Sequence, residues 1–267
     1  MTGAPLFFLV LIFLATSAIS VVTGSTSLIT VPAMFQFHID PRTAVATNMF
    51  ALTFMSVGGA LPFLRGNAVD RKRLPRLIVL TLAGSAIGAF LLLLVPARSV
   101  TLFVSVAMIA VSIFCVFYRK SGLQDATGTP SVSAEIACYV LTFLLGIYGG
   151  FFSGGYVTLL TAVYVGLFRM SFVQAIATTK IINVFSSAIA TGIFMQHGLV
   201  DYRLGIVLGI AMFVGALLGA RFAVRVGNLW LRRIFLTAVW ALGLKALLFD
   251  LFANNAGGGL PSHATQP

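Results

Sequence analysis

The chain has 267 residues, of which 59% are hydrophobic and only 9% are charged. Soluble domains carry roughly 25% charged residues, so this composition excludes a soluble globular protein and is typical of an integral membrane protein. The net charge of +11 does not indicate nucleic-acid binding, because the basic residues cluster at the ends of apolar runs and no loop is long enough to form a reading surface. These residues are expected to orient the chain and to contact the lipid bilayer.

A polar linker divides the predicted helices into two halves of similar layout. The first half, residues 1–118, has apolar runs at 6–20, 28–37, 44–64, 77–95 and 100–118. After the linker at 119–133, the second half, residues 134–252, has apolar runs at 136–152, 157–168, 175–194, 204–224 and 229–252. The polar, Gly-rich tail at 253–267 is expected to be disordered. The fold class is therefore an all-α polytopic membrane protein.

The second half is expected to repeat the first. A shift of 131 residues without a gap superposes Gly24 on Gly155, and the Ala-x-Ala-Thr run that ends at Thr47 on the one that ends at Thr178. In both halves a stretch of small residues breaks the first pair of apolar runs, at 23–27 and at 153–155. Glycine-interrupted segments at matching places in two repeats indicate a transport site.

The basic residues favour repeats of inverted orientation. If each half crosses the membrane an even number of times, the basic residues outside the apolar runs divide eight against seven between the two sides. If each half crosses an odd number of times, they divide twelve against three. Positive residues collect on the cytoplasmic side, so the odd count is preferred. Each half then consists of a helical hairpin, formed by its broken first pair of runs, and three spanning helices.

Lys180 is the leading candidate for function, because it lies several residues inside the apolar run 175–194. A charge at that depth costs on the order of 2.5–3.5 kcal/mol even by the milder scales, and such residues mark functional sites. The functional interpretation is a cation that binds an anionic substrate. The structural alternative is a lysine that reaches the interface or pairs with a carboxylate, but no acidic residue lies in the middle of a run.

Polar residues near Lys180 and at the two breaks complete the candidate site. The shift places Asn48 opposite Thr179, and a pseudo-two-fold axis is expected to bring these two positions towards each other. An ordinary interhelical hydrogen bond is the alternative. Helix N-termini at the breaks would favour an anion, although glycine there also allows a tight turn. The candidate substrate-binding residues are Lys180, Asn183, Thr179, Thr178, Asn48, Thr47, Gly24, Ser25, Thr26, Ser153, Gly154, Gly155 and Thr158.

Other features favour packing over chemistry. The pairs Gly84-x-x-x-Gly88 and Gly215-x-x-x-Gly219 are expected to let helices approach closely. The two cysteines lie in apolar runs without disulfide or metal-ligand spacing, so no metal site and no cofactor are expected. The sequence shows no paired carboxylates, histidine cluster or nucleophile–base arrangement, and an enzyme is therefore not expected.

Two motifs resemble the sulfite exporter TauE/SafE family of membrane proteins. They are the glycine-rich break Gly149–Gly155 and the segment Ala177–Asn183, and the duplicated layout extends the resemblance over nearly the whole chain. The first break reads Thr-Gly-Ser-Thr-Ser, where the family usually has more glycines. The resemblance implies an eight-helix permease with four helices in each half. It also implies sulfite, sulfonates, sulfoacetate or related sulfur-containing anions as substrates.

The sequence thus predicts a multi-pass transporter of the cell inner membrane that moves a small anion by alternating access. A membrane scaffold or assembly factor without transport and a passive anion channel are the alternatives. The prediction includes no nucleic-acid partner and allows a homodimer. The exact substrate, the direction of transport and the coupling ion stay open.

Overall fold

The computed structural model describes residues 3–64, 69–120 and 129–225. This part of the chain contains nine helices and no strand. The helices are α1 (Ala4–Thr23), α2 (Ser27–Gln36), α3 (Pro41–Leu64), α4 (Leu74–Leu94), α5 (Ala97–Lys120), α6 (Val132–Phe151), α7 (Tyr156–Gly166), α8 (Phe172–Gln196) and α9 (Tyr202–Arg225). The run expected at 229–252 and the tail at 253–267 lie outside the described residues.

Six of these helices are long and apolar enough to cross a membrane, namely α1, α3, α4, α6, α8 and α9. Helices α2 and α7 have only 10 and 11 residues, which corresponds to about 15 Å at 1.5 Å per residue. They can therefore reach only about halfway through a hydrocarbon core of roughly 30 Å. This confirms an all-α polytopic membrane protein in which two short apolar helices follow two longer ones.

Local sequence signals explain where several helices begin. Proline is the first residue of α3 and lies in the first turn of α4, where its missing N–H leaves no hydrogen bond unmade. Helix α8 begins with a capping box between Ser171 and Gln174. Helices extend into both ends of the segment expected as a linker at 119–133, because α5 continues to Lys120 and α6 begins at Val132. The hydroxyl of Ser131 accepts a hydrogen bond from a backbone N–H of α6 and so caps its start.

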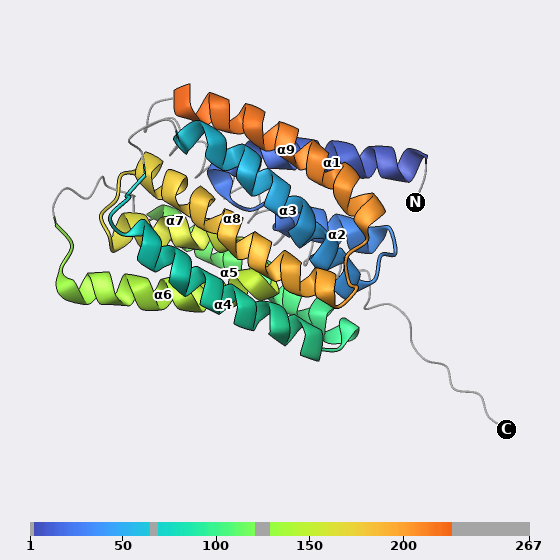
Figure 1. Cartoon of the computed structure of the whole chain (residues 1–267), viewed down its shortest axis with the longest axis horizontal. Coiled ribbons are helices and arrows are strands. Elements are labelled where there is room, and N and C mark those ends of the chain that lie inside the picture. The colour runs from blue at the N-terminus through green and yellow to red at the C-terminus, as the bar shows by residue number, and fades with distance from the viewer. Residues whose placement is uncertain (1–2, 65–68, 121–128, 226–267) are drawn as a thin grey trace.

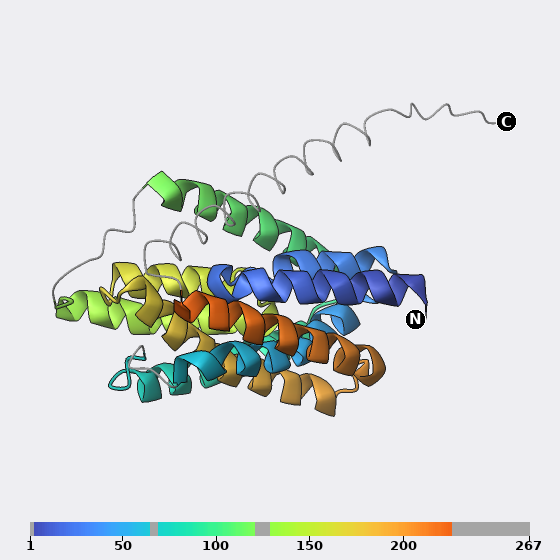
Figure 2. The same cartoon turned by 90° about the horizontal axis from the view of Figure 1, so that it is seen from above.

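The helices pack in pairs that bring together segments far apart in the sequence. Helix α1 packs along α9, and α6 packs along α4. Helix α3 contacts α9 and α8, and α8 also contacts α4 and α6. Figure 1 shows that α3 and α8 run in opposite directions, as do α4 and α9, and α1 and α6. Seen from above, α5 lies on the outside of the described helices (Figure 2).

Glycines allow α4 to approach α6 closely and α9 to approach α1 closely. A Cβ atom on Gly84 would lie 2.5 Å from the carbonyl oxygen of Phe143, and one on Gly88 would overlap the carbonyl of Ile147. Gly215 and Gly219 of α9 meet the backbone of α1 in the same way. The predicted packing role of both Gly-x-x-x-Gly pairs is therefore confirmed.

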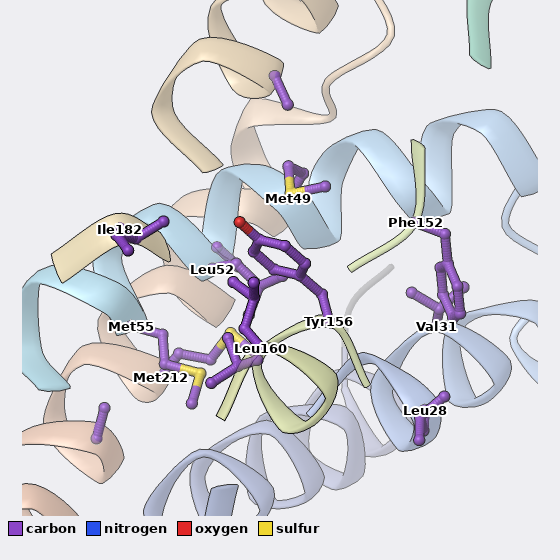
Figure 3. Packing of buried hydrophobic residues seen from close by; sticks show 14 of the residues in the cluster. Leu28, Val31, Met49, Leu52, Met55, Phe152, Tyr156, Leu160, Ile182 and Met212 are labelled. Atoms are coloured by element: carbon purple, nitrogen blue, oxygen red, sulfur yellow. The ribbon is translucent and has the colours of Figure 1, made fainter. Parts of the chain in front are cut away.

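The short helix α7 is buried among the long helices. Its residues Tyr156 and Leu160 are fully buried, and Figure 3 shows them beside Leu52 and Met55 of α3. Phe152, just before α7, lies next to Val31 of α2 in the same view. Both short helices therefore begin inside protein, where irregular backbone at membrane depth is tolerated.

Candidate functional site

The two helix breaks meet inside the molecule. The hydroxyl oxygens of Ser25 and Thr158 lie 2.8 Å apart, and those of Ser27 and Ser153 lie 2.7 Å apart. All four side chains are buried. Hydroxyl pairs therefore join the break between α1 and α2 to the break between α6 and α7, although the two breaks are far apart in the sequence.

Each break depends on a glycine in the left-handed conformation. Gly24 has φ 73° and ends α1, and Gly155 has φ 78° and precedes α7. Residues with a side chain rarely adopt this conformation. Gly24 also lies against the other break, because a Cβ atom there would be 2.8 Å from both the Val157 Cβ and the Thr158 nitrogen. Glycine is thus required at this position both by the turn and by the contact.

Lys180 lies beside this junction. Its side chain projects from α8, the residue is only 2% exposed, and Nζ donates a hydrogen bond of 3.1 Å to the carbonyl oxygen of Ser20. In the part of the chain that the structure describes, both ion pairs belong to Arg73, and no acidic side chain pairs with Lys180. The amine therefore neither pairs with a described carboxylate nor extends to the membrane surface.

A small cavity connects Lys180 with both breaks. Its volume is ≈ 10 Å³, which is about the room for one water molecule. The residues that line it are Gly24, Thr26, Ser27, Leu52, Met55, Ser153, Val157, Lys180 and Asn183. Five of the predicted site residues thus share one cavity. An anion with several heavy atoms does not fit this volume, so the cavity is closed in this conformation.

Asn183 continues the polar lining one helical turn after Lys180. It is 6% exposed, and its Nδ2 donates a hydrogen bond of 2.5 Å to the hydroxyl of Ser56 on α3. The hydroxyl of Thr26 donates to the sulfur of Met55, also on α3, at 3.4 Å. Helices α3 and α8 therefore supply the side walls of the cavity, and the breaks supply its ends.

Asn48 and Thr179, which the shift places opposite each other, form their described hydrogen bonds with other residues. Asn48 accepts a hydrogen bond of 2.7 Å from Thr30 of α2 and donates one of 2.9 Å to Ser27. The hydroxyl of Thr179 bonds the Ile176 carbonyl and lies 3.4 Å from that of Thr161 on α7. Asn48 of α3 thus bonds to α2, and Thr179 of α8 contacts α7, so each long helix bonds to the short helix that precedes it in the sequence.

The remaining predicted residues lie outside the cavity lining. Thr47 accepts a hydrogen bond of 3.0 Å from the backbone N–H of Asp201. The buried hydroxyl of Thr178 has no hydrogen-bond partner among the described residues. The carbonyl of Gly154 accepts a hydrogen bond from the hydroxyl of Tyr148. Thr47, Thr178 and Gly154 therefore lie near the cavity but do not line it.

Three polar groups near the cavity were missing from the predicted set. They are the hydroxyls of Ser27 and Ser56 and the carbonyl of Ser20. Ser27 was recognisable as part of the first break. Ser56 and the Ser20 carbonyl carried no such signal, because their roles depend on how α1, α3 and α8 pack.

Nothing in the described residues forms a metal site, since no group of three or more histidine, cysteine, aspartate or glutamate side chains lies together there. The chemistry of the cavity is instead that of one buried cation, one amide and several hydroxyls. Such groups donate hydrogen bonds and suit an anion.

Comparison with known proteins agrees with this description. The profile of the family described as "Sulfite exporter TauE/SafE" matches residues 8–246. The resemblance that the two sequence motifs indicated therefore extends over nearly the whole chain.

Curated relatives of similar length carry transporter names. The "Probable membrane transporter protein ORF9" of Sinorhizobium sp. is 28% identical over 226 residues, 85% of this chain and 86% of that protein. The "Probable membrane transporter protein YfcA" of Escherichia coli K12 is 26% identical over 253 residues, 92% and 91% of the two chains. A "Probable membrane transporter protein" of Haemophilus influenzae is 25% identical over 216 residues, 81% of this chain and 84% of that protein. No solved structure matches.

Proposed function

The chain belongs to the sulfite exporter TauE/SafE family, and from this premise we propose that it transports a small anion, such as sulfite, a sulfonate or a related sulfur-containing organic anion, by alternating access. The family and the six apolar spans make it a multi-pass protein of the cell inner membrane. The observation that carries the proposal is the burial of Lys180 beside a cavity that two helix breaks share.

Lys180 is the group that would neutralise the anion. An ammonium group within the membrane is costly unless it is paired, and its described partner is the Ser20 carbonyl alone. A bound anion would supply the missing charge. Sulfite and sulfonate oxygens accept several hydrogen bonds, and the amide of Asn183 and the hydroxyls of Thr26 and Ser153 line the same cavity.

The helix termini add to this preference for negative charge. Helices α2 and α7 both begin at the breaks, and a helix N-terminus carries a partial positive charge and unbonded backbone N–H groups. Discontinuous helices whose N-termini point at an anionic group are the usual binding element of transporters with repeats. The site thus combines a full charge with two dipoles of the same sign.

We further infer that the two halves are inverted repeats. Two features of the backbone recur at a spacing of 131 residues: the left-handed glycines Gly24 and Gly155, and the left-handed non-glycine residues His38 and Arg169. The hydrogen bond from Thr30 to Asn48 and the Thr161–Thr179 hydroxyl contact recur at the same spacing. The opposite directions of α3 and α8 in Figure 1 favour inversion.

The size of the cavity supports alternating access. Because it has room for about one water molecule, the anion can enter only if the surrounding helices separate on one side. Inverted repeats would allow the same separation on either side in turn.

The substitution Lys180→Ala tests the proposal. A hydrogen bond to a charged group is worth about 1.5–3 kcal/mol, so we expect a roughly 10- to 150-fold loss of anion affinity while the protein still inserts and folds. The measurement is uptake of labelled sulfite, methanesulfonate and sulfoacetate by proteoliposomes, with thermal shift as the binding assay. The matched control is Lys72→Ala, because Lys72 is exposed outside the spans.

Two outcomes would count against the proposal. Transport by Lys180→Ala at the wild-type rate would exclude the assigned role of Lys180. A rate that rises without saturation as the anion concentration increases would indicate a passive channel in place of alternating access.

A further inference from the structure

Helix α7 separates the Lys180 cavity from one end of the molecule. Val157, in its first turn, lines the cavity, and its last residue is Gly166, close to the start of α8. The end of the molecule that α7 approaches also holds the end of α3 and the starts of α4 and α6 (Figure 1). Among the described residues outside the apolar interior, nine basic residues lie at this end and three at the other. It is therefore the cytoplasmic end by the positive-inside rule.

The cytoplasmic end of α7 is attached by an arginine–aromatic contact. Phe168 follows α7, and the guanidinium carbon of Arg73 lies 4.8 Å from the centre of its ring. Arg73 donates hydrogen bonds to Asp70 at 2.8 Å and to Glu135 at 3.2 Å. Burial opposes the charge of Arg73, but these hydrogen bonds outweigh that effect and raise its pKa above the ordinary value. The cation over the ring is therefore permanently charged and fixed in position.

Phe168 and α7 make two further contacts with α6. The ring of Tyr139 packs against that of Phe168 at 5.4 Å, and the hydroxyls of Thr142 and Tyr164 lie 3.2 Å apart. Tyr139 also donates a hydrogen bond to Glu135. The loop before α4 and the first turns of α6 therefore both contact the end of α7 and Phe168.

The short helix of the first half is not attached in this way. Phe37 follows α2 at the position that the 131-residue shift relates to Phe168. Arg73 contacts the ring of Phe168, and none of the contacts shown for the described residues places a cation on the ring of Phe37. Among the described residues, the ends of the two short helices therefore differ in their contacts, because a cation is seen over the ring at the end of α7.

We propose that α7 is the element that opens the Lys180 cavity to the cytoplasm, and that Arg73 on Phe168 is the latch that keeps it closed. The assignment of the cavity as the transport site rests on the function proposed above. The turn through Gly154 and Gly155 connects α7 to α6, and the short segment 167–171 connects it to α8. Both connections can change direction without unfolding the long helices.

Cys138 offers a natural reporter of this opening. It is fully buried on α6, one turn after Glu135 and one turn before Thr142, which contacts α7. A buried thiol is inert towards alkylating reagents. If α7 moves away from α6, water and reagent reach Cys138 from the cytoplasmic side.

The test measures the rate at which a membrane-impermeant maleimide labels Cys138 in inside-out vesicles. The starting protein carries Cys115→Ser, which removes the other cysteine. We expect Phe168→Leu to raise the labelling rate roughly 2- to 30-fold, the factor that corresponds to one cation–π contact. Phe168→Tyr keeps the aromatic ring and should label as slowly as the starting protein.

Phe37→Leu is the matched control at the end of α2, and it should leave the labelling of Cys138 unchanged. An unchanged rate in Phe168→Leu, or an equal rise in Phe37→Leu, would overturn the proposal. Should the Phe168 variants fail to fold, hydrogen exchange of the unaltered protein decides. The amides of α7 should then exchange well before those of α8, and equal protection of the two helices would refute a mobile α7.

Neither measurement uses a substrate. If the Phe168 variants change the labelling rate as expected but no sulfur anion binds, the proposed transport function is wrong and the proposed movement of α7 is retained. If anions bind and are transported but the latch variants label like the starting protein, the latch alone fails.

Discussion

Single glycines determine how closely α4 and α6 approach. At Gly88 the backbone of α6 occupies the place that a side chain would take, and the carbonyl of Ile147 lies there. At Gly192, in the interior of α8, no atom lies within 4 Å of the position of a Cβ atom. The two glycines therefore have different physical roles although both lie inside helices.

We predict opposite effects of alanine at these two positions. Gly88→Ala forces α4 and α6 apart and should destabilise the protein by about 1–3 kcal/mol, the usual cost of overpacking. Gly192→Ala should stabilise it by about 0.4–1 kcal/mol, because alanine restricts the unfolded chain and meets no obstacle. Thermal unfolding of the detergent-solubilised proteins measures both. A Gly88→Ala protein as stable as the wild type would contradict the close contact.

Lys180 is the other residue whose meaning depends on its neighbours. The sequence placed a cation in an apolar run, and it left open whether a carboxylate or the membrane surface received it. The structure directs its amine to the backbone of α1 next to the two breaks. A backbone carbonyl carries only a partial charge, so it does not neutralise an ammonium group.

At the scale of elements, the position of α8 is important because it carries both Lys180 and Asn183. The capping box between Ser171 and Gln174 satisfies backbone groups at its start, where no preceding turn can do so. Since Ser171 is the last residue of the segment that joins α7 to α8, this cap also fixes where α8 begins beside the proposed moving element.

Removal of the cap should therefore weaken the fold measurably. We expect Ser171→Ala to lower stability by about 0.5–2 kcal/mol, as measured by thermal unfolding. Ser171→Asp is the control, because aspartate also accepts the hydrogen bond of an N-cap and should stay close to the wild type. Equal losses in both variants would show that the hydroxyl acts through some contact other than the cap.

The short helices α2 and α7 illustrate why two elements were recognisable without coordinates. Their apolar runs are too short to span a bilayer, and glycine precedes each one. A backbone that stops halfway is tolerated only where protein or a water-filled cavity covers it, and the sequence predicted that each broken pair of runs forms a helical hairpin. It did not show that the hydroxyls of Ser25 and Thr158 would bond each other.

At the scale of the whole molecule, the distribution of charge orients the protein. The start of α6 belongs to the end with nine basic residues, and the start of α5 belongs to the end with three. Because the positive end faces the cytoplasm, the start of α5 should face the periplasm.

Cysteine labelling checks this orientation. Ser99 in the first turn of α5 and Ser133 in the first turn of α6 are both exposed. In a protein without native cysteines, Ser99→Cys should react with an impermeant maleimide in intact spheroplasts, and Ser133→Cys only after permeabilisation. The reverse pattern would place the molecule the other way round. Labelling of both from outside would show that α5 and α6 begin on the same side.

The sequence by itself determined the membrane class, the family resemblance, the two breaks and the residues from which a site could be built. These follow from hydropathy, helix length and glycine chemistry, which are local properties of the chain. The tertiary structure alone decided that Asn48 and Thr179 bond to separate short helices. It also decided that Ser27 lines one cavity with Lys180, and that Ser56 bonds to Asn183 of the same cavity. That choice depends on helix rotation and on close contacts at glycines, and such contacts arise only when segments distant in the sequence pack against each other.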